Sequence, residues 1–253
     1  MQVERDSGHT DHTGHTGHTN QTKQTKQTYQ TLLFDFDHTL FDSDASEALA
    51  FVDTLHDFGV EDPNEHFAMY RRINNALWVA VERGTISPND LRTERFAQLA
   101  VAIGLDAKPS DIADRYVVAM GASGELYPGA FAVLEQLAAT STLALVTNAL
   151  SEVQRTRIAR VGIGSFFDAV VISGEVGPSK PSPAIYDITF ELLGHPAKES
   201  TLMIGDSLSS DIKGGTNFGI DTCWYNVHGK AASAADAVTH EISTLEQLLG
   251  FVD

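Results

Sequence analysis

Acidic residues stand at the ends of short apolar runs in this sequence, and their spacing suits chemistry on phosphate. Asp35 and Asp37 lie in DFDHT, and Asp206 and Asp211 lie in GDSLSSD. Lys180 lies in GPSKPSP. Alternate residues of an extended chain face the same side, so Asp35 and Asp37 can both point into one pocket. Carboxylates gathered in this way repel one another unless a hard cation lies among them. Mg²⁺ suits such a place, because it prefers a few carboxylate oxygens together with water and phosphate.

These residue types together predict phosphoryl transfer. One carboxylate can attack phosphorus and form an aspartyl-phosphate. A second carboxylate can protonate the leaving oxygen and then activate water. The candidate phosphate-binding residues are Lys180 and the Thr147-Asn148 pair of VTN, and they would hold the remaining negative charge together with backbone amides.

The elements that must position these residues alternate between strand and helix. Near-continuous apolar runs predict strands that are buried on both faces. The expected strands are TLLFDFD from residue 31, and then 142–148, 168–173, 201–206 and 220–226. The expected helices between them are 128–139, 151–161, 182–194 and 209–218. This order predicts an α/β protein with a Rossmann-like parallel sheet, whose ligands bind at the carboxyl ends of the strands.

A helical segment interrupts this pattern just after the first strand. Four stretches between residues 43 and 124 carry apolar residues at helical spacing. Ser87-Pro88-Asn89-Asp90 is a strong helix start, since it combines a cap residue, a proline at the first position and an acid near the positive helix end. We therefore expect residues 31–42 and 125–253 to form the core, and residues 43–124 to form an inserted helical domain.

The first 30 residues have a different character. From His9 they repeat threonine at every third position and contain almost no apolar side chains. Such a segment cannot offset the entropy of ordering, so residues 1–30 are predicted to be a disordered low-complexity tail. Its histidines could capture a transition metal, although an extension without function is the simpler interpretation.

The overall composition excludes several classes of protein. The 253 residues include 34 acidic and 17 basic side chains, which give a formal net charge of −17. A body this acidic repels phosphate polymers, and the single Cys223 excludes an intramolecular disulfide framework. No apolar run approaches the ~18 residues of a membrane span, and no secretory signal precedes the first strand. We expect a cytoplasmic protein that binds neither nucleic acid polymers nor membranes.

The motifs together resemble those of the haloacid dehalogenase superfamily of phosphatases. Asp-x-Asp-x-Thr, Thr-Asn, Lys-Pro and Gly-Asp-x4-Asp follow apolar runs in this order, and the resemblance covers about residues 31–250. It implies that Asp35 is the nucleophile and Asp37 the general acid/base. It also implies Mg²⁺ as cofactor, bound by Asp35, the backbone carbonyl of Asp37 and Asp206, with Asp211 supporting or joining the metal shell. Asp37 favours phosphate over halide chemistry, because dehalogenases do not carry this second acid in the same role.

The helical segment resembles the small α-helical cap of that superfamily. Residues 71–96, RRINNALWVAVERGTISPNDLRTERF, are similar to the cap of bacterial pyrimidine-nucleotide 5′-phosphatases. In this interpretation Trp78 could stack on a base, and Asn74 or Asn75 could bond the edge of that base. Arg92 is the arginine expected to assist phosphate binding. Packing of Trp78 inside the cap is the alternative.

These observations predict a Mg²⁺-dependent phosphomonoesterase that hydrolyses pyrimidine nucleoside 5′-monophosphates. Its expected partner is therefore a small phosphorylated metabolite. The alternatives are a small sugar-phosphate or phosphoglycolate phosphatase, a mutase, and an inactive protein that binds a phosphorylated metabolite. The intact Asp35, Asp37, Lys180 and Asp206 argue against the last of these.

Overall fold

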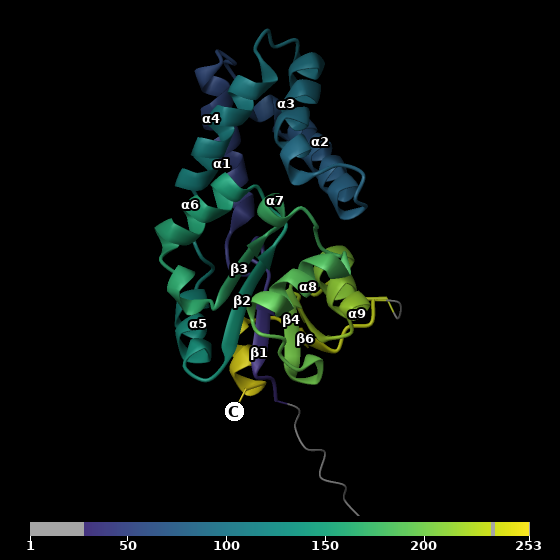
Figure 1. The fold of residues 1–253 in the computed structure, drawn as a ribbon. Coiled ribbons are helices and arrows are strands. Elements are labelled where there is room, and N and C mark those ends of the chain that lie inside the picture. Colours follow the sequence, from purple (N-terminus) through teal and green to yellow (C-terminus); the bar gives the residue numbers. More distant parts are fainter. Residues whose placement is uncertain (1–27, 234–235, 253) are drawn as a thin grey trace, which may run out of the picture.

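A parallel β-sheet lies at the centre of the protein (Figure 1), as seen in a computed structural model that describes residues 28–233 and 236–252. Within these residues the sheet has six strands in the order β3-β2-β1-β4-β5-β6. The strands are β1 (Thr31–Phe34), β2 (Thr142–Thr147), β3 (Ala169–Ile172), β4 (Thr201–Gly205), β5 (Asp221–Tyr225) and β6 (His240–Ile242). The predicted α/β architecture is confirmed, and β1 lies in the middle, between β2 and β4.

Helices cover both faces of this sheet because successive strand residues point to opposite sides. Leu32 and Phe34 join the apolar cluster that includes α5 and the C-terminal turn, whereas Leu33 joins the cluster that includes α8 and α9. The α-helices in the second half of the chain are α5 (Ala130–Ala138), α6 (Ser151–Val161), α7 (Ser173–Val176), α8 (Pro183–Leu192) and α9 (Lys213–Phe218). Burial on both faces explains why the strands are apolar throughout.

Two local features differ from the sequence-based expectation. Strand β6 was not predicted, because its three residues, His-Glu-Ile, are too few to show a period. The helix expected over 209–218 is divided into a π-type turn, Leu208–Ile212, and α9. This turn carries Asp211 back toward the end of β4.

Four helices between β1 and α5 form a group of their own, which Figure 1 shows at the upper end of the molecule. They are α1 (Ser43–Asp57), α2 (Asn64–Glu82), α3 (Pro88–Ile103) and α4 (Pro109–Ala122). Aromatic rings pack between these helices. The ring centres of Phe51 and Tyr70 are 4.7 Å apart, and those of Phe96 and Tyr116 are 5.1 Å apart. The predicted start of α3 is confirmed, since Ser87 and Asp90 form a capping box. We refer to residues 43–122 as the helical insert.

The ordered core includes residues that the sequence assigned to the tail. Tyr29 is only 2% exposed, its backbone NH donates to Phe251 O at 2.8 Å, and its hydroxyl donates to Asp221 at 2.8 Å. The tail prediction is therefore wrong for this tyrosine, and the His/Thr repeat itself lies outside the described residues. Among the described helices, none is both long and apolar enough to cross a membrane.

Candidate active site

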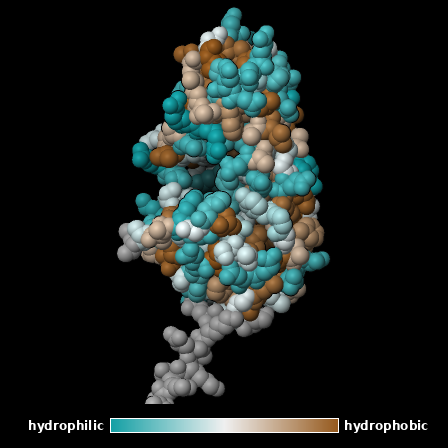
Figure 2. Space-filling model, turned by 180° about the vertical axis from the view of Figure 1, so that it is seen from behind, coloured by the Kyte–Doolittle hydropathy of each residue, from teal (hydrophilic) through white to brown (hydrophobic). Residues whose placement is uncertain are grey.

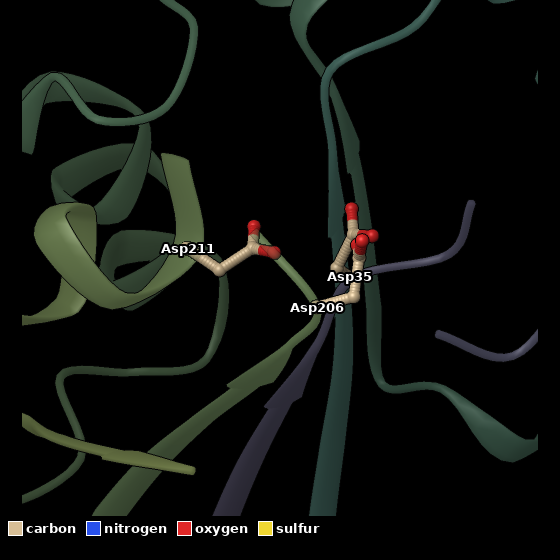
Figure 3. Close-up of side chains that lie close together, drawn as sticks. All are labelled: Asp35, Asp206 and Asp211. Atoms are coloured by element: carbon tan, nitrogen blue, oxygen red, sulfur yellow. The ribbon is translucent and has the colours of Figure 1, made fainter. Parts of the chain in front are cut away.

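The site begins where the two central strands end. β1 and β4 are parallel neighbours with Phe34 opposite Ile204, so the residues just beyond them, Asp35 and Asp206, emerge side by side (Figure 3). Asp211 reaches the same point from the turn after β4. One carboxylate oxygen of each of the three aspartates lies within 4.8 Å of the other two. The sheet thus brings together three acidic residues that are up to 176 positions apart in sequence.

Gly205 makes the close approach of Asp211 possible. A Cβ atom at this position would lie 2.1 Å from Asp211 Oδ2, a distance that no side chain could tolerate. The Asp211 carboxylate is only 1% exposed, and its Oδ2 accepts a hydrogen bond from the backbone NH of Ser207 at 3.0 Å. The glycine before Asp206 is therefore a steric requirement of the acidic cluster.

Lys180 lies inside this cluster and is 1% exposed. Its Nζ donates to Asp35 Oδ1 at 2.6 Å and to the Val146 carbonyl at 2.6 Å, and it pairs with Asp211 Oδ1 at 2.8 Å. Asn148 fixes the backbone of this lysine, because its amide both donates to Lys180 O at 2.9 Å and accepts from Lys180 NH at 2.8 Å. The predicted phosphate-binding Asn148 thus acts here by holding Lys180.

Burial changes the proton affinity of these groups. It raises the pKa of Asp35 to about 8, against the opposing effect of Lys180 and with further repulsion from Asp211 and Asp206. Burial and the Asp211 carboxylate raise the pKa of Asp206 to about 7. Burial opposes the charged form of Lys180, but the two carboxylates around it outweigh this and raise its pKa. One ammonium therefore does not balance three carboxylates.

The donor set fits a hard divalent cation. Three carboxylates share one lysine, so the ionised groups of this cluster carry more negative than positive charge. Mg²⁺ takes oxygen ligands and keeps several waters, so it needs few protein groups. The carboxylate of Asp37, a residue expected to bind the metal through its backbone carbonyl, points away from this cluster toward α6. The backbone carbonyl of Asp37 is the atom of that residue that stays a candidate ligand.

The Asp37 carboxylate is held by several donors. Oδ1 accepts from Arg157 Nη1 at 3.0 Å and from the Ser43 hydroxyl, and Oδ2 accepts from Gln154 Nε2 at 2.8 Å. Its side chain is 26% exposed and lines the same cavity as Asp35. Sequence reasoning missed the two residues of α6, although Gln154 and Arg157 are polar residues at one-turn spacing on a helix that must pack against the sheet.

Thr147 ends β2 beside this group and is almost fully buried. Its hydroxyl accepts from Gln154 Nε2 at 3.0 Å, and the residue does not line the cavity. A bound phosphate would have to reach the hydroxyl at the bottom of the site. The structure therefore places Thr147 next to the predicted site but not at its open surface.

A cavity of about 250 Å³ separates the ends of the strands from the helical insert. In Figure 2 one face is hollowed between the upper part and the body of the molecule, with hydrophilic residues around the hollow. Helix α2 contributes three of the residues named from the sequence, Asn74, Asn75 and Trp78, to the lining. Trp78 is half-buried and does not belong to the apolar cluster inside the insert, so simple core packing does not describe it.

The polar residues of the insert differ in position. Asn74 is buried, and it bridges Glu47 at 2.8 Å and Arg95 Nη1 at 3.3 Å. Arg92 lies outside the lining: its guanidinium donates to Asp114 at 2.7 Å and faces Glu152 at 3.6 Å. Arg95, one turn further along α3, lines the cavity instead. The sequence-based choice was Arg92, and the sequence did not show which arginine of α3 faces inward.

The fold agrees with a comparison against known protein families. A profile of the haloacid dehalogenase-like hydrolases matches residues 32–225, and the chain therefore belongs to this family of hydrolases. It is 36% identical to the pyrimidine 5′-nucleotidase PynA of Streptococcus pneumoniae, over 88% of this chain and 94% of that protein. It is 35% identical to the pyrimidine 5′-nucleotidase YjjG of Escherichia coli, over 86% of this chain and 95% of that protein.

A solved structure shows the same architecture. The putative hydrolase YfnB of Bacillus subtilis, in a form bound to magnesium, superimposes with a TM-score of 0.82 at 35% identity. The match covers 88% of this chain and 98% of YfnB. The family and the fold that the motifs predicted are confirmed.

Proposed function

We propose that this hydrolase is a Mg²⁺-dependent phosphatase of pyrimidine nucleoside 5′-monophosphates. The observation that carries the chemistry is the cluster of Asp35, Asp206 and Asp211 around Lys180, at the bottom of a cavity that also exposes Asp37. The similarity to PynA and YjjG over most of the chain supports the choice of substrate. A cytoplasmic location belongs to the same proposal.

In the first step, an oxygen of Asp35 attacks phosphorus and the ester bond breaks. The leaving oxygen takes the bonding electrons and receives a proton from Asp37. In the second step, Asp37 accepts a proton from water as the water oxygen attacks the phosphorus of the aspartyl-phosphate. Asp35 leaves as a free carboxylate, and the products are phosphate and a nucleoside.

The other polar groups orient the reacting atoms and balance charge. Lys180 contacts the Asp35 carboxylate directly, so it holds the nucleophile and faces the phosphate that becomes attached to it. Thr147 does not line the cavity, so it would contact a phosphoryl oxygen only if the phosphate reaches its buried hydroxyl. Asp35, Asp206 and the backbone carbonyl of Asp37 would hold Mg²⁺ with the support of Asp211, and the ion would neutralise charge on the phosphoryl oxygens.

Residues 43–124 act as a cap that closes over the leaving group. Trp78 offers a flat face for a pyrimidine base. Asn75, three residues earlier on α2, also lines the cavity and offers donors and acceptors for the edge of the base. Asn74 positions Glu47 and Arg95 instead of meeting the base, because its amide already bonds both. Arg92 is not part of this proposal, since Asp114 and Glu152 surround its guanidinium.

The test is phosphate release from a panel of substrates by the purified full-length chain. UMP, dTMP, AMP, phosphoglycolate and p-nitrophenyl phosphate are compared, with Mg²⁺ and with a chelator. We expect metal-dependent turnover, a preference for UMP and dTMP, and loss of turnover in Asp35→Asn, which has the same shape without the nucleophilic charge. A preference for phosphoglycolate would replace the substrate assignment, and undiminished activity of Asp35→Asn would overturn the mechanism.

A further inference from the structure

One face of α6 contacts Asp37, the general acid/base of the proposed function. Gln154 and Arg157 are three residues apart on this helix, so their side chains lie on the same face. Both donate to the Asp37 carboxylate, one to each oxygen. Neither residue belongs to the four motifs that define the acidic cluster.

Arg157 is held far more rigidly than a surface arginine. Its side chain is 2% exposed, and its guanidinium lies 4.7 Å from the centre of the Phe41 ring. Nε donates to Met120 O at 2.9 Å, Nη2 donates to Ser46 Oγ at 2.6 Å, and Nη1 donates to Asp37. Met120 belongs to α4 and Ser46 to α1, so this one side chain joins α6, the base of the helical insert and Asp37.

We propose that Arg157, assisted by Gln154, is a positioning residue that holds the Asp37 carboxylate in place for proton transfer to the leaving group. This inference rests on the proposed function, in which Asp37 is the general acid/base. Because the same guanidinium bonds α1 and α4, the position of Asp37 also depends on how the helical insert is seated on the core.

The hydrogen bonds further indicate which oxygen of Asp37 transfers the proton. A carboxylate offers about four lone-pair sites, two on each oxygen. Arg157 and Ser43 occupy both sites of Oδ1, whereas Gln154 occupies one site of Oδ2. Among the residues that the structure describes, no donor occupies the second site of Oδ2, which is left for the proton. In the first step this proton passes to the ester oxygen, which departs with the electron pair of its bond to phosphorus while Asp35 forms the new bond.

The orientation of Gln154 agrees with this assignment. Its Nε2 bridges Asp37 Oδ2 and the Thr147 hydroxyl, and its Oε1 is buried without a partner among the described residues. The opposite orientation of the amide would place Oε1 against a carboxylate oxygen. Gln154 therefore donates to Asp37 while its own Oε1 stays buried without a hydrogen bond. An unsatisfied buried polar atom costs stability, and such atoms are found at functional sites.

The experiment compares a substrate that needs a proton with one that does not. The nucleoside of UMP leaves as an alkoxide and must be protonated, whereas p-nitrophenolate leaves as a stable anion. The measured quantity is kcat/KM, which covers the steps up to departure of the leaving group and excludes hydrolysis of the phospho-enzyme that both substrates share. Arg157→Met, Arg157→Lys and Gln154→Leu are compared with wild type, together with their melting temperatures.

We expect Arg157→Met to lower kcat/KM for UMP by about 100-fold, within the ~10²–10⁴-fold that general acid catalysis contributes. The loss on p-nitrophenyl phosphate should stay below about threefold, because proton donation contributes little to that reaction. Arg157→Lys should recover part of the UMP activity, since it restores a donor. If Arg157→Met does not fold, Gln154→Leu serves as the test, because its amide donates only to Asp37 and Thr147 among the described residues.

Arg160→Met is the matched control. Arg160 lies one turn further along α6 and also bonds the end of α4 and the segment after it, through the Gly121 carbonyl at 3.3 Å, Ser123 at 2.9 Å and Gly124. It does not contact Asp37, so its loss should affect both substrates alike. Equal losses on both substrates in Arg157→Met and Gln154→Leu would overturn the inference and leave the proposed function intact. Absence of metal-dependent turnover in wild type would instead refute the proposed function.

Discussion

Replacement of Trp78 by alanine should remove nucleotide preference while leaving phosphatase chemistry in place. Trp78 is half-buried on the cavity wall and lies outside the apolar cluster of the helical insert, so its loss opens no large core cavity. Stacking of a base on an aromatic ring contributes about 1–3 kcal/mol. At about 1.4 kcal/mol for each factor of ten, this corresponds to a selective loss of roughly 5- to 150-fold.

The assay measures kcat/KM for UMP and for p-nitrophenyl phosphate in Trp78→Ala, and the melting temperature of each protein. The ratio of the two kcat/KM values should fall in Trp78→Ala, and Trp78→Phe should lie between it and wild type because it keeps a smaller ring. Val79→Ala is the matched control, since Val79 is the next residue of α2, is 42% exposed and does not line the cavity. Equal losses on both substrates with a large drop in melting temperature would show that Trp78 is structural and would refute the stacking argument.

Three further outcomes are expected. Gly205→Ala should abolish measurable turnover and weaken Mg²⁺ binding by calorimetry, because its Cβ would lie 2.1 Å from Asp211 Oδ2, and wild-type binding would contradict this geometry. Without metal, the melting temperature should fall as pH rises from about 4 to about 8, because the raised pKa values of Asp35 and Asp206 mean that the native state binds more protons than the unfolded state there. Asp206→Asn should weaken this dependence of the melting temperature on pH. A melting temperature that rises between about pH 4 and about pH 8 would contradict the expected direction. A chain that begins at residue 31 should melt several degrees below one that begins at residue 28, because it lacks the buried Tyr29, and burial of such a ring contributes about 3–5 kcal/mol; equal melting temperatures would show that Tyr29 is dispensable.

The sequence alone determined the elements that form through local patterns. Strands such as 142–148 and 201–206 were visible because a parallel strand covered on both faces is apolar at every position. The start of α3 was visible because its cap residues stand next to one another. Asp35 and Asp206 could be expected to meet, since the carboxyl ends of parallel strands share one edge of the sheet.

Only the tertiary structure decided which side chains reach the cavity and which are buried elsewhere. Arg92 and Arg95 stand on the same helix with similar surroundings in sequence, and the choice between them depends on how α3 packs against α2 and α4. The link from Arg157 to Asp37 joins residues 120 positions apart and was likewise invisible in any local pattern. Helical periodicity describes one helix at a time, whereas these contacts depend on the rotation of each helix against its neighbours, which is set by packing across the whole chain.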